Sequence, residues 1–459
     1  MSRTSLLVFV LVVVGLATAL MAYATRDSSG SPSGATAVPQ PTAAQLEAAY
    51  LGKLPIAPES ERVDVGTATF TNPTAITNPL FPISDLHSAV LNGTVEGKTF
   101  HTETTLLPET RIIEWADGQK VETLVSQYVA FLDGRIEEVA LDYYAQADDG
   151  SVWYFGEDVF NYKDGFIADT DGTWLAGKEG PPAMIMPADP KPGDVYRPEN
   201  APGLVFEEVT VKTVDKRVTG PRGLVSGAIV AGELHQDGSR ENKTFAPGYG
   251  EFFTGSGGDV EAMAVAVPTD ALDAPVPTAL EALSAAADAA FAATRASNWK
   301  SASASVDKLD AGWKSYRSQQ VPPRIAAEMS SAIAALDTAV AARDRARAAT
   351  VAIDVAQSAL DLELRHRPPA DIDRARFELW AHQLLVDATA RNMAGVRGDL
   401  ATLEWIRDRF AVTLDKVDLT RVDTQLVGLR AALNDDDLRG IAVGADRLGA
   451  TIAGIEARG

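Results

Sequence analysis

Residues 117–165 read DGQKVETLVSQYVAFLDGRIEEVALDYYAQADDGSVWYFGEDVFNYKDG, and this stretch determines how the first half of the chain folds. Asp-Gly pairs divide it at intervals of 16, 16 and 15 residues, beginning at Asp117, Asp133, Asp149 and Asp164. Such pairs favour two-residue hairpin turns, because both turn positions need a positive φ. Between them, residues 121–132, 136–147 and 152–162 are rich in β-branched and aromatic side chains. We therefore predict an antiparallel meander of long strands.

The same signals extend the sheet on both sides of this meander. Further turn signals are Asn92-Gly93, Asp171-Gly172 and Asp237-Gly238. Additional strands are expected over residues 205–214, 223–234, 243–245 and 260–267. Strands of about a dozen residues exceed the usual five or six and twist strongly. We therefore predict that residues 61–270 form one acidic antiparallel β domain, either a barrel or a strongly curved sheet.

The composition changes near Pro275-Val276-Pro277, after which Ala, Leu and Arg predominate, and these residues favour helices. Four segments align on an aspartate, at spacings of 47, 45 and 47 residues: Asp307, Asp354, Asp399 and Asp446. Residues that cap helix starts precede each one, namely Asn298, Asp344, Asn392 and Asn434-Asp435. The repeat predicts an all-α domain over residues 278–458, built from about four helical hairpins. The predicted fold class is α+β in two bodies.

The net charge of −22 lies almost entirely in the predicted β domain. Residues 59–273 contain 36 acidic and 15 basic side chains, whereas residues 275–459 contain 25 and 23. This balance excludes nucleic acid as a partner, because phosphate binding needs a basic surface. It is typical of a soluble, self-repelling surface or of a site for divalent cations. The chain has no cysteine, which excludes disulfides, thiolate metal sites and cysteine nucleophiles.

The N-terminus carries a targeting pattern. Arg3 precedes an apolar run from Leu6 to Leu20, and Ala22-Tyr23-Ala24 offers a cleavage site. Residues 1–24 are therefore predicted to be a signal peptide or, if uncleaved, a membrane anchor. Residues 25–60 are rich in Ser, Gly, Pro, Thr and Ala and predict a flexible linker. The remainder is expected outside the cytoplasm, secreted or anchored to the cytoplasmic membrane, with membrane contact only through the N-terminal segment.

Several motifs in the predicted β domain resemble a family of exported bacterial β-rich proteins that has no established activity. They include Asn78-Pro79-Leu80-Phe81-Pro82, Gly150 to Asp158 (GSVWYFGED), Met184-Ile185-Met186-Pro187-Ala188 and Ala246-Pro247-Gly248-Tyr249-Gly250. The resemblance covers roughly residues 75–252 and does not extend to the helical part. It implies an extracytoplasmic β-rich domain and carries no activity over to this chain.

Aromatic residues of the predicted sheet are candidates for ligand binding. They lie on two neighbouring strands and in the last of the motifs above, and are Tyr143, Tyr144, Trp153, Tyr154, Phe155 and Tyr249. Alternation sends Trp153 and Phe155 to one face of the sheet and Tyr154 to the other. These side chains either fill an aromatic core or line a concave surface for an apolar or amphipathic ligand, such as a lipid or a cell-wall fragment.

Carboxylates and histidines indicate two places where a metal ion could bind. In the β domain the candidate ligands are Glu157, Asp158, Asp169 and Asp171, although no complete twelve-residue calcium loop is present. In the helical domain they are Glu363, His366, Glu378 and His382, and Glu363-x-x-His366 has the spacing of a di-iron helix. The two helical pairs are expected to differ in height by about 16 Å along an antiparallel hairpin, so they do not share one ion. Turn formation explains most of the Asp positions in the β domain equally well.

We therefore expect an exported, non-enzymatic protein whose β domain binds an envelope-associated apolar or amphipathic ligand. The helical domain is expected to bind a protein partner or to act as a spacer, since repeats make extended surfaces. The alternatives are an extracytoplasmic protein that binds calcium or a transition metal, and a cell-envelope hydrolase. Neither Gly-x-Ser-x-Gly nor His-Glu-x-x-His occurs, so no catalytic residue and no cofactor is predicted.

Overall fold

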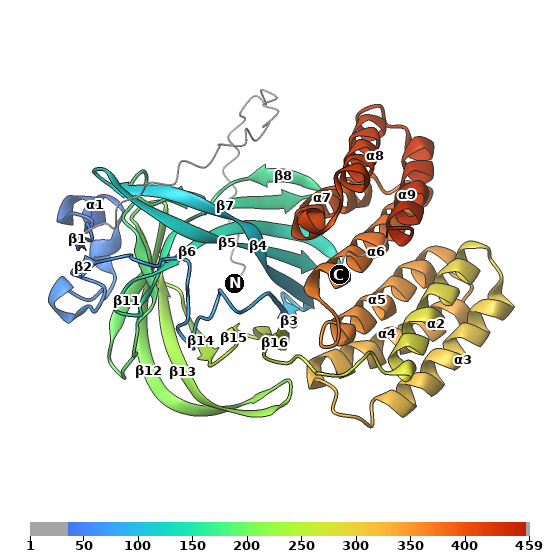
Figure 1. Cartoon of the computed structure of the whole chain (residues 1–459), viewed down its shortest axis with the longest axis horizontal. Coiled ribbons are helices and arrows are strands. Elements are labelled where there is room, and N and C mark those ends of the chain that lie inside the picture. Colours follow the sequence, from blue (N-terminus) through green and yellow to red (C-terminus); the bar gives the residue numbers. More distant parts are fainter. Residues whose placement is uncertain (1–34, 456–459) are drawn as a thin grey trace, which may run out of the picture. The chain divides into compact units, whose positions relative to one another are not determined.

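The computed structural model describes residues 35–455 (Figure 1). A large antiparallel sheet in the N-terminal part is followed by helices, which confirms an α+β fold in two parts. The predicted signal peptide or anchor, residues 1–24, lies outside the described residues, as does the start of the predicted linker. Over residues 35–455, no helix is both long enough and apolar enough to cross a membrane.

Within residues 35–455 the sheet contains fourteen strands, and neighbouring strands pair in antiparallel fashion. They are β3 (Ser88–Val95), β4 (Lys98–Ala116), β5 (Gln119–Leu132), β6 (Arg135–Gln146), β7 (Val152–Lys163), β8 (Phe166–Asp169), β9 (Trp174–Leu175), β10 (Ala183–Met186), β11 (Val195–Ala201), β12 (Val205–Gly220), β13 (Gly223–His235), β14 (Arg240–Ala246), β15 (Gly250–Ser256) and β16 (Asp259–Val267). Their order is β10-β7-β6-β5-β4-β3-β16-β15-β14-β13-β12-β11, with β8 and β9 paired to β7. The predicted meander corresponds to β5, β6 and β7 and is confirmed.

The sheet is strongly curved but is not closed, so the barrel alternative is wrong (Figure 1). β10 and β11 are the two end strands, and no pairing joins them within residues 35–455. β10 has only four residues, and β11 contains Pro198, which has no N–H to donate, as is typical of an edge strand. The curvature gives the sheet a concave face (Figure 1). Side chains from β4, β5, β12 and β13 line one cavity on this face.

Most of the Asp-Gly turns form as predicted, for example at Asp133-Gly134 and Asp164-Gly165, where both residues have a positive φ. The turn predicted at Asn92-Gly93 is wrong, because both residues lie within β3. A Cβ atom on Gly93 would lie 1.6 Å from the carbonyl oxygen of Val260 on β16. Glycine is needed here for the close approach of two strands, and the chain turns instead at Glu96-Gly97.

Eight helices follow the sheet in the described part of the chain. They are α2 (Thr278–Arg295), α3 (Trp299–Tyr316), α4 (Pro323–Ala341), α5 (Arg345–Glu363), α6 (Pro369–Ala390), α7 (Met393–Phe410), α8 (Lys416–Asn434) and α9 (Leu438–Ala453). The aspartates of the predicted repeat lie on α3, α5, α7 and α9. Asn298, Asp344 and Asn392 cap the first three of these helices as predicted, whereas Asp437 caps α9. Most of one apolar core comes from α2–α5, and α6–α9 enclose another.

The described part of the predicted linker contains short elements that contact the sheet. They are β1 (Thr36–Ala37), α1 (Ala43–Ala48) and the 3-10 turns η1 (Leu51–Lys53) and η2 (Glu59–Glu61). β1 pairs with β2 (Thr67–Ala68). Leu51 is fully buried, and the N–H of Ala57 donates to the carboxylate of Glu208 on β12 at 2.8 Å. Residues 35–60 thus include short helical elements and a strand, in spite of their linker-like composition.

The helices contact the outer face of β4 and β5 through a buried group of charged and polar side chains. Glu103 on β4 pairs with Arg376 on α6 at 3.2 Å and with Arg409 on α7. Arg409 also donates to the side-chain carbonyl of Gln127 on β5 at 2.6 Å. All four side chains are buried, so this group ties the sheet to two helices in a place that excludes water.

Candidate functional site

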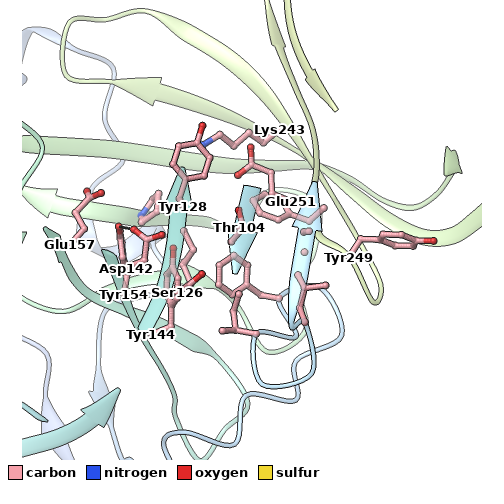
Figure 2. A pocket seen from close by; sticks show the side chains of 18 of the residues that line it. Thr104, Ser126, Tyr128, Asp142, Tyr144, Tyr154, Glu157, Lys243, Tyr249 and Glu251 are labelled. Atoms are coloured by element: carbon pink, nitrogen blue, oxygen red, sulfur yellow. Dashed lines mark hydrogen bonds between the residues drawn. The ribbon is translucent and has the colours of Figure 1, made fainter. Parts of the chain in front are cut away.

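Two adjoining cavities, of about 250 Å³ and 700 Å³, lie on the concave face of the sheet. They share five lining residues, Leu91, Thr104, Tyr128, Lys243 and Glu251, most of which are labelled in Figure 2. The larger cavity is of the size typical of small-molecule pockets, about 300–1,000 Å³. These cavities are the candidate functional site.

Alternation along the strands determines which side chains reach the cavities. On β4, Thr104 lines both cavities, whereas its neighbour Glu103 contacts the helices. On β5, Ser126 and Tyr128 line the smaller cavity, whereas Gln127 between them accepts a hydrogen bond from an arginine of α7. One face of the sheet therefore packs on helices and the other encloses the cavities.

Carboxylates dominate the walls of both cavities. Ten of them line the described part of the site, against a single lysine, Lys243. The ten are Glu138, Asp142, Glu157, Glu199, Glu207, Glu233, Glu241, Glu251, Asp259 and Glu261. They come from strands on both sides of the concave face, so the negative charge surrounds the enclosed space.

The strand register places carboxylates directly opposite one another three times. The pairs are Asp142 with Glu157 (β6, β7), Glu199 with Glu207 (β11, β12) and Glu233 with Glu241 (β13, β14). Like charges in such cross-strand positions are destabilising. The site therefore has a deficit of positive charge, which Lys243 and the neighbouring His235 offset only in part.

Several of these carboxylates are partly protonated near neutral pH. Burial raises the pKa of Asp142 to about 7, although the hydrogen bond that the Tyr154 hydroxyl donates to it at 2.6 Å lowers the pKa. Burial and the charge of Asp142 raise the pKa of Glu157 well above its usual range. Burial and the charge of Glu207 raise the pKa of Glu199 to about 8.

Burial also raises the pKa values of carboxylates on the opposite wall. Burial raises the pKa of Glu233 to about 8, even though Lys243 Nζ lies 3.2 Å from Glu233 Oε2 and lowers the pKa. Burial and the charge of Glu251 raise the pKa of Glu261 to about 7. Burial lowers the pKa of Lys243, but the surrounding carboxylates raise it by more, so this lysine stays charged. A bound cation would favour the ionised carboxylates and release their protons.

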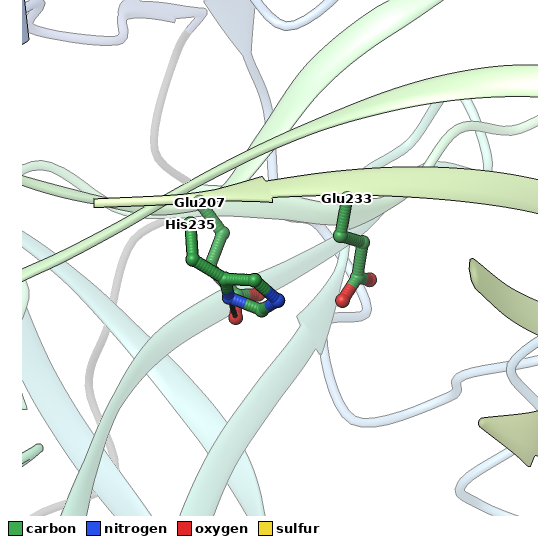
Figure 3. A group of neighbouring side chains, drawn as sticks. All are labelled: Glu207, Glu233 and His235. Atoms are coloured by element: carbon green, nitrogen blue, oxygen red, sulfur yellow. Dashed lines mark ion pairs between the residues drawn. The ribbon is translucent and has the colours of Figure 1, made fainter. Parts of the chain in front are cut away.

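Glu207, Glu233 and His235 form a compact group on one wall (Figure 3). Glu207 lies opposite His235 in the register, and Glu233 lies two residues before His235 on β13, so the three share a face. One ligand atom from each lies within 4.8 Å of the other two, and no other such group occurs in residues 35–455. Hydrogen bonds to Glu207 and Glu241 raise the pKa of His235 to about 10, so its ring is protonated.

The smaller cavity also has an apolar part. It is formed by Phe81, Ile83, Leu86, Leu91 and Phe245. The rings of Tyr144 and Tyr154 stack with centroids 4.8 Å apart and border the same space. The cavity therefore offers apolar surface and carboxylates side by side, which suits an amphipathic ligand with positive charge.

Three of the six aromatic residues predicted to bind a ligand line the smaller cavity, namely Tyr144, Tyr154 and Tyr249. Tyr144 and Tyr154 lie beside Asp142 in Figure 2. Tyr249 borders the cavity, but its ring points away from the other labelled residues, and its hydroxyl donates to Asp270 at 2.8 Å. The structure thus brings two of the predicted tyrosines together with carboxylates.

The other three aromatic candidates lie elsewhere. Phe155 is fully buried in the core and packs edge-on against Trp115. Trp153 is buried in the same core. Tyr143 donates to Asp158 at 2.6 Å and is not among the residues that line the cavities. Neighbours along β7 thus take different sides of the sheet, as alternation predicts.

The carboxylates predicted as metal ligands in the β domain do not meet. Glu157 lines the smaller cavity, whereas Asp158, the next residue, pairs with Arg111 at 2.8 Å. Asp169 is exposed and accepts a hydrogen bond from the backbone N–H of Asp171 at 3.2 Å. The last two aspartates therefore stabilise a turn.

Glu363 and His366 in the helical part have protein partners of their own. Ser284 donates to one carboxylate oxygen of Glu363 at 2.6 Å, and Arg367 donates to the other at 2.8 Å. His366 donates from Nδ1 to the backbone carbonyl of Ala274 at 2.9 Å. The two side chains are thus engaged in contacts that hold the helices and the preceding loop.

Glu378 and His382 on α6 lie in different surroundings from that pair. His382 stacks on Phe291, with ring centroids 4.4 Å apart, and burial lowers the pKa of His382 to about 4. Burial and the charge of Asp288 raise the pKa of Glu378. The structure does not bring the four helical candidates together into one group of metal ligands.

Most carboxylates of the cavities are absent from the sequence-based candidates, which include only Glu157. The sequences of β13 and β14 nevertheless contain a pattern of alternating charged residues. Glu233 and His235 on β13, and Glu241 and Lys243 on β14, occupy alternate positions, so that one face of each strand carries charge. In sequence this pattern is typical of a solvent-exposed face, and only the curvature of the sheet turns it inward.

No protein-family model matches this chain, and no curated protein matches it significantly. The resemblance of residues 75–252 to exported bacterial proteins is therefore carried by the motifs alone.

Proposed function

We propose that this chain is an exported, non-enzymatic binding protein, and that the concave face of its sheet binds an amphipathic ligand bearing protonated amines. The observation that carries this proposal is the threefold placement of carboxylate opposite carboxylate in adjoining cavities. Such pairs lower the stability of a sheet that has no ligand. Glu207, Glu233 and Glu241 already pair with His235 or Lys243. Among the described residues, Asp142, Glu157 and Glu199 form no ion pair, so a cationic ligand would supply the charge that this part of the site lacks.

A protonated amine suits this site because it replaces protons that the carboxylates otherwise hold. Groups with pKa values of about 7 to 8, such as Asp142, Glu199 and Glu233, are partly protonated at neutral pH. An ammonium group at hydrogen-bond distance favours their ionised form, so that binding releases protons. Charge pairs in an enclosed cavity are also stronger than pairs on an open surface.

The apolar part of the smaller cavity supports an amphipathic ligand over a bare cation. Phe81, Leu91 and Phe245 offer surface for a hydrocarbon chain or ring beside the carboxylates. Lipids and cell-wall fragments that carry free amines have this chemistry. In this proposal the N-terminal segment holds the domain outside the cytoplasm, and the helices serve as an interaction module or spacer.

Decylamine, a single amine on an apolar chain, is expected to bind the purified chain at neutral to mildly alkaline pH, whereas decanoate, the matched anion, is not. Glu157→Gln removes one carboxylate of the pair with Asp142 and is expected to weaken decylamine binding about tenfold. The control is Glu404→Gln, which alters a half-exposed pair with Arg430 on the helices and should leave the affinity unchanged. Isothermal titration calorimetry measures the affinity of the original chain for both ligands and the affinity of each variant for decylamine. Equal binding of decylamine and decanoate would rule the proposal out.

A divalent metal ion is a second candidate ligand, favoured by the group Glu207, Glu233 and His235. Two carboxylates and an imidazole form a set that zinc accepts, provided that His235 gives up its proton. Titrations with ZnCl₂ and CaCl₂ separate the two candidates. Zinc binding that is lost in His235→Gln, together with no binding of decylamine, would favour the metal.

A further inference from the structure

A third cavity, of about 460 Å³, lies between the outer face of the sheet and helices α4, α5 and α6. It is distinct from the cavities of the concave face, with which it shares only Phe100 among its described lining residues. Because this cavity lies on the other side of β4 from the concave face, it takes no part in the proposed function. Its volume is that of a site for one small molecule.

One side of this third cavity is aromatic and aliphatic. Phe131 on β5 stacks on Trp380 on α6, with ring centroids 5.1 Å apart and the ring planes at 21°. Val351, Leu379 and Ala335 continue the apolar lining. A ring placed here would bury its apolar surface against these side chains and interact with an aromatic neighbour.

The other side of the cavity holds a hydrogen-bonded chain that runs from the sheet to α4. His101 Nδ1 lies 2.7 Å from Asn92 Oδ1, and His101 Nε2 lies 3.3 Å from Glu103 Oε1. Both partners accept, so both ring nitrogens donate and the imidazole is protonated. Burial lowers the pKa of His101, but the hydrogen bond to Glu103 and the nearby carboxylates raise it by more. The amide of Asn92 then donates to Glu328 Oε2.

Glu328 is the last residue of this hydrogen-bonded series, and one of its two carboxylate oxygens is not used. Its Oε1 makes no hydrogen bond to any residue of the described chain. Glu103 and Asp361, by contrast, are already paired with Arg376. Asp354 on α5 adds a further carboxylate to the lining.

Two cations of the described chain line the cavity, and both are held by other carboxylates: the imidazole of His101 faces Glu103, and Arg135 pairs with Asp387 and with Asp399 at 3.2 Å. Burial raises the pKa of Glu328 to about 7, and a nearby ammonium group would favour its ionised form. Glu328 and Asp354 therefore offer a ligand negative charge.

We propose that this third cavity binds a small aromatic amine, with its ring packed against Phe131 and Trp380 and its ammonium group on the carboxylate of Glu328. An ammonium group would fill the free acceptor of Glu328. An aromatic carboxylate of the same size would meet Glu328 and Asp354 instead and be repelled. The proposal stands independently of any ligand on the concave face.

Phenethylamine and its matched anion, phenylacetate, are the probes. Trp380 lines the cavity, so tryptophan fluorescence, excited where neither probe absorbs, is expected to change and saturate with phenethylamine and not with phenylacetate. Glu328→Gln is expected to weaken phenethylamine binding at least about tenfold. Ala335→Leu is expected to weaken it by a similar factor, because it fills the cavity without altering a charge.

Two further measurements make the outcome specific. Decylamine binding should be the same in both variants and in the original chain, because neither residue lines the concave-face cavities. Thermal unfolding shows whether each variant folds. If Glu328→Gln does not fold, the affinity of Ala335→Leu for phenethylamine tests the proposal. Equal binding of phenethylamine and phenylacetate, no binding of phenethylamine, or unchanged affinity in the folded variants would overturn the proposal.

Discussion

Replacing Arg376 by methionine is expected to lower the free energy of unfolding by about 3–5 kcal/mol. The guanidinium of Arg376 is fully buried and lies 3.2 Å from Glu103 and 2.7 Å from Asp361. Methionine fills much of the same volume but leaves these buried carboxylates with less compensating charge. Because Glu103 is on β4 and Arg376 is on α6, the loss falls on the contact between sheet and helices. The free energy of unfolding is measured by chemical denaturation, with circular dichroism as the signal.

The matched control is Arg421→Met. Arg421 pairs with Asp418 at 2.7 Å, and its side chain is about half exposed. An exposed pair of this kind contributes about 0–1 kcal/mol. If the two variants lost similar amounts of stability, the buried group around Glu103 would not be what holds the helices against the sheet.

A loss of stability between about pH 5.5 and 8, in the absence of ligand, is the second large effect that we expect. The pKa values of Asp142 and Glu261 are about 7 and those of Glu199 and Glu233 are about 8 in the folded chain, against roughly 4 when unfolded. The folded chain therefore binds more protons than the unfolded chain over this window, and stability falls as pH rises. His235 also lowers the stability as pH rises, since its pKa of about 10 keeps it protonated in the folded chain while it loses its proton in the unfolded chain. Differential scanning calorimetry is expected to show a midpoint about 5 °C or more lower at pH 8 than at pH 5.5.

Neutralising one carboxylate of a like-charged pair should reverse part of this loss. Glu199→Gln is expected to raise the unfolding midpoint at pH 8 and to change it little at pH 5.5, because it removes the repulsion with Glu207. Glu208→Gln is the control, since Glu208 is buried and pairs with Arg197 at 3.0 Å. That variant should unfold at a lower temperature at both pH values. A midpoint that stays constant or rises between pH 5.5 and 8 would show that the carboxylates of the cavities ionise freely.

The elements of the fold could be predicted because their signals are local. The Asp133-Gly134 turn needs two residues with a positive φ, and the caps Asn298 and Asn392 act within one helical turn. The ends of the sheet and the docking of the helices depend instead on distant contacts. Glu103 and Arg409 are 306 residues apart in sequence, and nothing local to either indicates the pairing.

The candidate site could be predicted only in part, for a similar reason. Tyr144, Tyr154 and Glu157 stand out in sequence because they lie in a dense aromatic stretch, and they do line the smaller cavity. The pattern Glu241-x-Lys243, by contrast, is typical of a solvated strand face. The sheet has to curve before β14 faces β5 across an enclosed space, and curvature is a property of many strands together.

Binding of decylamine at two pH values tests most directly whether the ionised carboxylates of the concave face hold a cation. The amine stays protonated from pH 6 to pH 8, whereas carboxylates with pKa values of about 7 to 8, such as Glu233, ionise across that range. We predict that calorimetric titration shows binding at least about tenfold tighter at pH 8 than at pH 6, with protons released to the buffer near pH 7. Equal affinity at the two pH values, with no release of protons, would contradict a cation site built from these carboxylates.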